Sequence, residues 1–227
     1  MLFHSLLKIY FAFLFTSLLF VTTGFSQSTS YLDSLDGKYA LQFQINENFS
    51  LSNFQGSTLS GKYHFSTRDA IRLGLSLELS NSESETSSNQ IDTINVITNS
   101  GDRNAFGITL NSQYIRYIRG TNDISFFGGG GPFFTYETST TNSKVNINET
   151  IEKYKRTMES YTFGVDLLIG VEWWFHKYMS LSAEYGMKFM YSSHESVNEV
   201  GVVRKKLTDN YFRIAANSIN FGITVYF

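Results

Sequence analysis

Cysteine is absent from the 227 residues, and proline occurs once. Without cysteine there is no disulfide framework, no thiolate metal site, no cysteine nucleophile and no lipid-modified cysteine. The formal net charge is only −2, so the chain has no overall charge that would draw it to nucleic acid. Apolar residues make up 42% of the chain, which is too many for a disordered protein.

Aromatic residues are abundant instead, with 21 Phe, 14 Tyr and 2 Trp, although the mean hydropathy is −0.15. A soluble core seldom needs so many rings, and a bundle of membrane helices would be far more apolar. The length suits one domain or at most two. The composition therefore favours an architecture in which rings are plentiful but the average residue is polar.

The N-terminal residues have the pattern of a secretory signal peptide. Lys8 precedes a mostly apolar run that ends at Val21, too short for the ~20 residues of a bilayer-spanning helix. Gly24 and Ser26 are small residues at the spacing of a cleavage site that follows Ser26. An uncleaved anchor is the alternative. We expect a signal peptide at 1–26, a short polar lead-in at 27–37 and one domain at 38–227.

Apolar and polar residues then alternate with a period of two, which predicts strands with two different faces. From Ile71 to Leu79, five aliphatic residues share one face, opposite Arg72 and Glu78. No stretch approaches the length of a membrane helix. The alternation predicts eight strands, at 38–49, 56–66, 69–80, 104–117, 123–136, 160–176, 179–191 and 211–227.

The predicted connections alternate in length, as they do in an up-and-down barrel, where successive connections emerge at opposite ends. The short connections are 66–69, 118–122 and 176–178. The long and polar connections are 50–55, 81–103, 137–159 and 192–210. The pattern predicts a closed cylinder with tight turns at one end and loops at the other.

One face of this cylinder is apolar and the other carries charge. A soluble, lipocalin-like barrel would turn the apolar face inward, whereas a membrane barrel turns it toward lipid. Aromatic residues near the strand ends favour lipid, because such rings gather where hydrocarbon meets headgroups. We therefore predict an all-β, eight-stranded antiparallel up-and-down transmembrane β-barrel. Its expected aromatic belt is Tyr117, Trp173, Phe175, Tyr178, Tyr136, Tyr161 and Tyr191.

The polar face would then line the lumen, with charges at Lys62, Arg72, Glu78, Asp166, Glu172, Glu184 and Lys188. These groups could form an ion path, or they could neutralise one another in a plugged interior. Eight strands leave room only for side chains, and an unpaired buried charge is expensive. We expect the plugged interior.

The C-terminal strand resembles that of small Gram-negative outer-membrane β-barrel proteins with OmpA/OmpX-like architecture. Apolar residues alternate there up to a final Phe, and 170–186 is similar to the penultimate hairpin of such barrels. The resemblance implies insertion in the outer membrane, with both termini and the short turns in the periplasm. It also implies that the barrel-assembly machinery binds Phe221, Ile223, Val225 and Phe227.

Other motifs carry less chemistry. The four glycines at 128–131 lack the Lys and Ser/Thr of a phosphate loop, so we expect them to make room for bulky neighbours or to form a sharp bend, with Pro132 at a bulge. His64 and Ser66 form a His-x-Ser pair like that of outer-membrane lipid A deacylases. This pair lies on the polar face beside a short turn, where it would not meet lipid.

Two basic clusters in the predicted loops could bind lipopolysaccharide phosphates, or could simply be solvated. They are Lys153, Lys155 and Arg156, and Arg204, Lys205 and Lys206. Taken together, the sequence predicts a monomeric outer-membrane barrel without enzymatic activity, metal or cofactor. Its expected partners are membrane lipids, lipopolysaccharide and the assembly machinery. The alternatives are a narrow passive channel and a lipid A-modifying enzyme.

Overall fold

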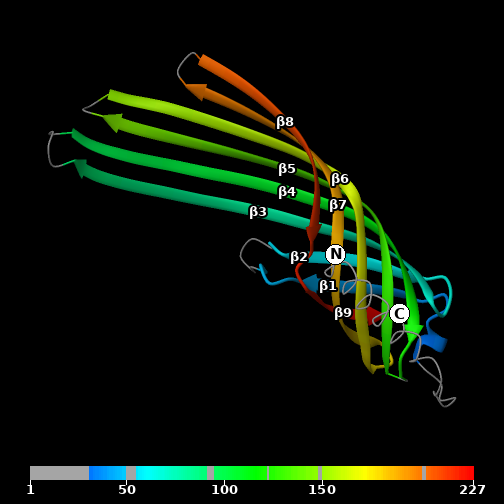
Figure 1. Cartoon of the computed structure of the whole chain (residues 1–227). Helices are drawn as coiled ribbons and strands as arrows, with labels where there is room; N and C mark the ends of the chain where they lie inside the picture. The colour runs from blue at the N-terminus through cyan, green and yellow to red at the C-terminus, as the bar shows by residue number, and fades with distance from the viewer. Residues whose placement is uncertain (1–30, 50–54, 91–94, 122, 148–149, 201–202) are drawn as a thin grey trace, which may run out of the picture.

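The computed structural model describes residues 31–49, 55–90, 95–121, 123–147, 150–200 and 203–227. The expected signal peptide lies outside these residues, as does most of the 50–55 connection. Within the described ranges no helix is long and apolar enough to cross a membrane. The described chain forms one antiparallel sheet (Figure 1). Its strands are β1 (Tyr39–Ile45), β2 (Ser57–His64), β3 (Asp69–Gln90), β4 (Asn95–Arg119), β5 (Ile124–Ile147), β6 (Thr150–His176), β7 (Met179–Val200), β8 (Val203–Ala216) and β9 (Asn220–Tyr226).

The sheet closes into a ring because β1 pairs with β9. Each of the first seven strands pairs with the next, and β7 pairs with both β8 and β9. β8 and β9 lie along successive stretches of β7, so together they occupy one strand position of the ring. We call each of these strand positions a stave. The predicted eight-stranded, antiparallel up-and-down barrel is therefore confirmed, with its eighth strand divided at Asn217–Ile219.

The strands of the ring are staggered. Following the pairing partners of Phe43 from strand to strand leads round the ring to Phe212 on β8, whereas Phe43 itself pairs with Ile223 on β9. Such an offset after one circuit is the shear that tilts the strands of a barrel against its axis. The stagger brings together side chains that are more than a hundred positions apart in the sequence.

Six strands, β3 to β8, continue far beyond the ring. The polar segments 81–103, 137–159 and 192–210 were expected to be loops, and this expectation is wrong, because the strands run through most of each segment. The pairing there is regular, for example between Thr140 and Thr157. These strands are polar on both faces, so they show no hydrophobic period, although Thr favours strands.

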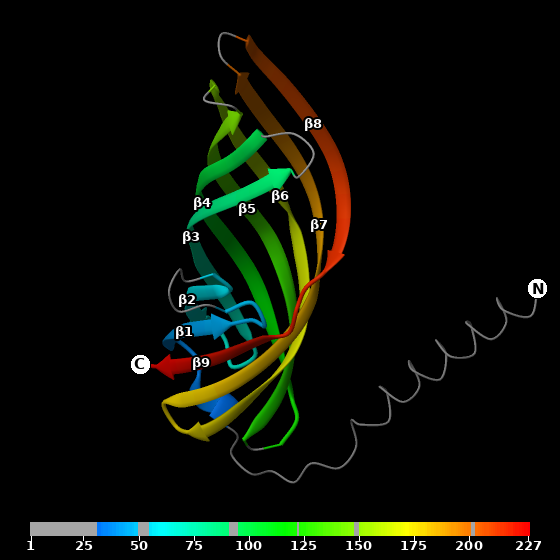
Figure 2. The same ribbon diagram turned by 90° about the vertical axis from the view of Figure 1, so that its left-hand side faces the viewer.

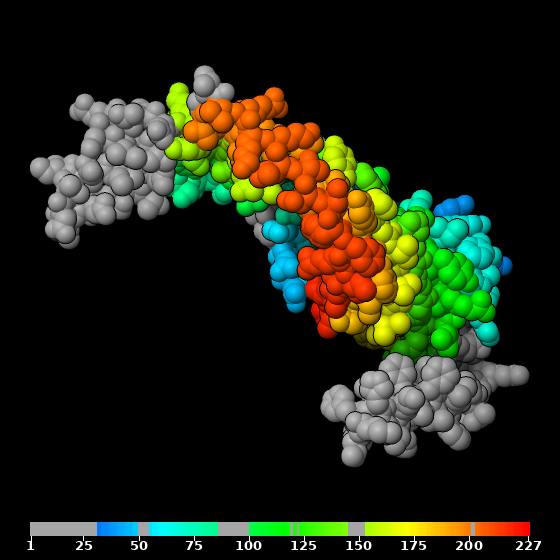
Figure 3. Space-filling view, turned by 45° about the horizontal axis from the view of Figure 1, so that its top comes forward, coloured from blue at the N-terminus to red at the C-terminus, as the bar shows by residue number. Residues whose placement is uncertain are grey.

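The extension is open, unlike the ring. Pairing between β2 and β3 ends at Leu59–Leu75, and pairing between β1 and β9 ends at Ile45–Phe221. Among the described residues nothing pairs with β3 beyond Leu75 on the side away from β4, or with β8 on the side away from β7, so these two strands are the free edges of a curved sheet in that part of the chain (Figures 1 and 2). The space-filling view shows an elongated, bent body in which β8 runs along one side (Figure 3).

The Gly-rich stretch of β5 lies in the wall of the ring. A Cβ at Gly131 would lie 1.9 Å from the carbonyl oxygen of Ser112, and one at Gly129 would lie 2.2 Å from that of Tyr114. Glycine therefore lets the neighbouring strand approach closely. The expected bulge at Pro132 is wrong: the β4–β5 pairing skips Gly131 and Pro132 but resumes in the same register, because proline merely lacks the ladder donor.

The lead-in is expected to be a short polar segment, but its described part also forms an ordered turn with two buried leucines. Tyr31–Ser34 forms one 3₁₀ turn, and Leu32 and Leu35 are buried in the core cluster at the short-turn end of the ring. The Gly37 N–H donates to the carbonyl oxygen of His64 at 2.9 Å. The two leucines are three residues apart, which is a helical spacing, so a strand-like alternation does not reveal them. The segment caps this end of the barrel.

We predict that Leu35→Ala lowers the free energy of unfolding by about 3 kcal/mol, because it leaves a cavity in a buried cluster. Denaturant unfolding of the refolded protein, followed by tryptophan fluorescence, measures this loss. Leu41→Ala is the matched control, since Leu41 is 52% exposed on the outer face of β1 and should cost much less. Equal losses in the two variants would contradict a buried cap.

Candidate functional site in the barrel lumen

The outer wall of the ring is an apolar band. Outward residues of every stave are large and exposed, for example Leu73, Phe126, Ile169 and Tyr185. Alternate residues point inward and are buried, including Gln42, Ser60 and Thr224. This distribution, apolar outside and polar inside, is the one found in membrane-spanning barrels and the reverse of a lipocalin.

Aromatic residues mark both borders of the band. Near the short turns, Trp173, Phe175 and Tyr178 are exposed on the outer wall. At the opposite border the outer rings of Tyr136 and Tyr161 lie 5.0 Å apart, and Tyr191 packs 5.3 Å from Phe163. All six rings therefore lie on the outer face near the strand ends.

Tyr117, the seventh expected belt residue, is a correction. It is only 1% exposed and points into the lumen, because the outward residues of β4 are the even-numbered ones, such as Tyr114 and Ile118. The strict alternation of β4 already places its odd-numbered residues, including Tyr117, on the inner face. Its place near a strand end had suggested the belt instead.

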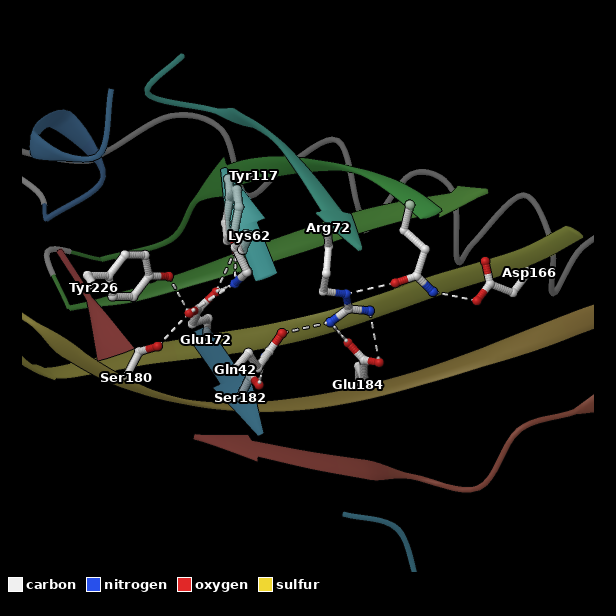
Figure 4. Close-up of polar contacts among 11 residues, drawn as sticks. Gln42, Lys62, Arg72, Tyr117, Asp166, Glu172, Ser180, Ser182, Glu184 and Tyr226 are labelled. Carbon is white, nitrogen blue, oxygen red and sulfur yellow. Dashed lines mark hydrogen bonds and ion pairs between the residues drawn. The ribbon is translucent and has the colours of Figure 1, made fainter. Parts of the chain in front are cut away.

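The first lumen cluster surrounds Glu172, which is completely buried (Figure 4). Lys62 Nζ lies 3.1 Å from Glu172 Oε2, and the same carboxylate accepts hydrogen bonds from Tyr117 and Tyr226, both at 2.6 Å. Ser180 donates to it as well. Lys62 also donates to Tyr117 Oη at 2.9 Å. Five groups from five strands therefore share one neutralised ion pair.

The second cluster surrounds Arg72 (Figure 4). Its guanidinium forms a bidentate pair with Glu184, at 2.8 and 3.1 Å, and donates to Gln42 at 3.0 Å and Gln113 at 2.7 Å. Gln113 in turn donates to Asp166, which also accepts from the Gly131 N–H at 3.1 Å. Arg72 thus has both charge and hydrogen-bond partners, which a buried guanidinium needs.

The lumen is closed at one end and open at the other. The Leu32–Leu35 cap is followed by the Glu172 cluster and then by the Arg72 cluster. Beyond Arg72 lies a cavity of about 300 Å³, lined among others by Gln44, Glu78, Glu137 and Lys188. The two remaining expected lumen charges, Glu78 and Lys188, therefore line this cup rather than join the buried ion pairs.

The sequence predicts the charged members of both clusters but not their uncharged partners. Gln42, Gln113, Ser180, Ser182 and Tyr226 all complete the network, and each occupies an inward position of its strand. The sequence could have revealed them, because each lies an even number of positions from another inward-facing residue of its strand. Which residues pair across the lumen depends on the stagger of the ring, which no local pattern reveals.

The His-x-Ser pair is divided by the structure. The His64 ring is buried in the lumen, 5.4 Å from the Tyr117 ring, whereas Ser66 lies in the turn and donates to Asp69 at 2.8 Å. Neither residue faces the outer wall. Among the described residues there is also no group of three or more His, Asp or Glu that could hold a metal ion.

The two basic clusters lie close together on the extension, separated only by β7. Lys155 and Arg204 are both partners of Glu199, which lies 3.6 Å from Arg204. Lys206 pairs with Glu195 at 2.7 Å. By the alternation, Lys153, Lys155, Arg204 and Lys206 share the outer face, whereas Arg156 and Lys205 lie on the inner face. The clusters therefore do not form one uniformly basic surface.

The expected assembly residues lie on β9 and at the chain end, and all belong to the outer face. Phe221, Ile223 and Phe227 are exposed, and Val225 is half-buried. They lie on the outer wall beside the pairing of β1 with β9, which joins the two ends of the sheet into a ring.

No protein-family model matches this chain. A comparison with curated proteins finds no match either. Among solved structures it is similar to Ail, the attachment invasion locus protein of Yersinia pestis, with 11% identity and a TM-score of 0.34 over 85% of this chain and 99% of that one. CarO of Acinetobacter baumannii has 10% identity and a TM-score of 0.38, over 86% and 99%. Neisserial surface protein A has 11% identity and a TM-score of 0.27, over 85% and 98%. These are Gram-negative outer-membrane β-barrel proteins, and the superpositions are loose.

We predict that Glu172→Gln lowers the free energy of unfolding by about 3–5 kcal/mol, because it leaves the Lys62 charge buried without a counterion. The double variant Lys62→Met/Glu172→Gln should recover more than half of this loss. Denaturant unfolding of all three proteins measures both effects.

The control for this cycle is an exposed ion pair. Arg116 lies 3.5 Å from Asp69 and is 62% exposed, so Arg116→Ala should cost less than about 1 kcal/mol. A double variant no more stable than Glu172→Gln alone would contradict the assigned coupling between Lys62 and Glu172.

Proposed function

We propose that the chain is an outer-membrane β-barrel protein with a sealed lumen and a structural, surface-interaction role rather than an enzymatic one. The observation that carries the proposal is the continuous apolar band around a closed ring. A soluble protein rarely exposes so large an apolar surface. In a bilayer the same surface contacts hydrocarbon, and ring closure satisfies the backbone within the sheet.

The orientation follows from the asymmetry of the two ends. The short turns would face the periplasm, together with the N-terminal cap, and the six-stranded extension would project from the cell. This extension is polar, largely exposed on β8 and held by long antiparallel pairing. It offers a large surface for contacts with other molecules.

A narrow passive channel is the second candidate, because the lumen contains charged side chains. Two observations weigh against it. The Lys62–Glu172 and Arg72–Glu184 pairs use hydrogen bonds across the interior, and Leu32 and Leu35 block the short-turn end. An ion would have to break two buried ion pairs and displace the cap.

Surface labelling tests the location and the orientation. The chain has no native cysteine, so single cysteines report without background. Thr140→Cys on the extension should react with a membrane-impermeant maleimide on intact cells. Thr67→Cys, in the turn between β2 and β3, should react only after the outer membrane is permeabilised.

The labelled proteins should also remain in the membrane after carbonate extraction, and should migrate differently before and after boiling in detergent. Labelling of Thr67→Cys on intact cells would reverse the proposed orientation. Release by carbonate would remove the membrane assignment and favour a soluble barrel.

Planar-bilayer recording separates the sealed barrel from the channel. We expect no stable openings from the wild-type protein, because the ion pairs and the cap fill the lumen. A large porin reconstituted in parallel shows that the bilayer reports conductance. Discrete openings that Arg72→Ala or Glu172→Ala abolishes would overturn the sealed lumen in favour of a channel.

A further inference from the structure

The wall of the barrel has a slot where two staves stop early. β1 and β2 have seven and eight residues, whereas their neighbour β3 has 22. The ring therefore has eight strand positions, but only six strands, β3 to β8, continue into the extension. The slot is two strands wide, and its sides are the free edges of β3 beyond Leu75 and of β8. Figure 2 shows the short hairpin at its foot.

The lower part of this slot lies within the apolar band. Leu77 and Leu79 on β3 are exposed and face outward, as are Phe212 and Ile214 on β8. Free N–H and C=O groups of a sheet edge cost several kcal/mol each where hydrocarbon replaces water. If the band is embedded as proposed above, both edges need hydrogen-bonding partners at this depth.

The direction of the two edges decides what fits between them. β3 runs away from the short turns, and β8 runs back toward them. Antiparallel pairing therefore needs one strand that descends beside β3 and one that ascends beside β8. A single β-hairpin with its turn toward β1 and β2 provides both, at the ~4.8 Å spacing of neighbouring strands.

The charges of the two edges are opposite. From Ser76 to Gln90, β3 has the acidic residues Glu78, Glu83 and Glu85 and no Lys or Arg. β8 has Arg204, Lys205, Lys206 and Arg213 against the single acidic residue Asp209, and two of these cations, Arg204 and Lys206, also pair with Glu199 and Glu195 of β7. Opposite charges on directly facing positions of neighbouring strands stabilise a sheet, and like charges destabilise it.

We propose that the slot between β3 and β8 binds a β-hairpin of a partner protein outside the cell, with a basic first strand beside β3 and an acidic second strand beside β8. The outward residues near the hairpin turn are apolar, because they continue the band. This inference rests on the proposed outer-membrane function and gives its surface-interaction role a defined site and a defined ligand chemistry.

Two synthetic hairpin peptides test the site. Both have the same turn, the same alternating Thr and Val, and fluorescent labels. The first has Lys in the descending strand and Glu in the ascending strand, and the second has these charges exchanged. Their affinities for the refolded full chain in detergent are measured by fluorescence anisotropy. The wild-type protein should bind the first peptide roughly tenfold more tightly than the second.

A charge reversal on β3 should abolish the ranking, because β8 stays basic and each peptide then has one oppositely charged and one like-charged edge. Glu83→Lys/Glu85→Lys changes two exposed residues on the outer face, and Glu83 lies beside Asp102, so a lysine there gains a neighbouring carboxylate. The matched control is Thr138→Lys/Thr140→Lys, which adds positive charge to β5 in the middle of the sheet and should leave the ranking unchanged. Boiling-dependent migration verifies that each variant is folded.

Position is tested separately by crosslinking. Ser82→Cys on β3 should form a disulfide with a peptide cysteine in the basic strand and not with one in the acidic strand. Equal binding of both peptides, or no binding by a folded protein, would overturn the hairpin site while leaving the membrane barrel in place. Co-purified phospholipid that blocks the peptides, or Ser82→Cys crosslinks between copies of the chain, would assign the slot to lipid or to a second copy instead.

Discussion

The pairing of β1 with β9 is the interaction on which the rest of the structure depends. Six residues of β1, from Ala40 to Ile45, join the first strand of the chain to its last. Without this seam β1 and β9 would be two more free edges, and the open sheet would not enclose its polar face in a lumen. With it, every strand of the ring has a neighbour on both sides up to the Leu59–Leu75 and Ile45–Phe221 pairs, so the apolar face can lie outward there without exposing unpaired backbone. The outward residues of β9 lie beside this seam, so ring closure and the expected assembly signal concern the same strand.

Closure also dictates the chemistry of the lumen. Eight staves enclose so little space that inward side chains must fit against one another. Gly170 makes room for the Phe127 ring, and Gly164 does so for Phe133. In this narrow space neither bulk water nor distance weakens the field of a charge. Lys62 therefore has Glu172 and the Tyr117 hydroxyl as partners, and Arg72 has Glu184 and two glutamines. The network is a consequence of the narrow ring, and in the proposed function it also seals the lumen.

The sequence predicts the ring well and the remainder poorly, for one physical reason. Alternation arises only where a strand has one apolar face, so Ile71–Leu79 or the last strand could be identified residue by residue. The extension has water on both faces, so alternation predicts loops where its strands run. Tyr117 could have been placed by the parity of β4, which its aromatic character obscured. Leu32 and Leu35 follow a helical spacing, and the Lys62–Glu172 pair depends on the stagger of the whole ring.

The free edges of the extension are the places where a strand of another molecule could pair with this sheet. Natural sheets protect exposed edges with charge, and β3 and β8 are both charged, with opposite sign. In neighbouring copies of the chain, two β3 edges repel each other, and so do two β8 edges. Two copies in one membrane also present like edges in parallel, whereas the sheet is antiparallel throughout. The charges and the strand directions therefore act together against pairing of like edges. The same features leave the slot complementary to a strand pair of opposite direction and opposite charge.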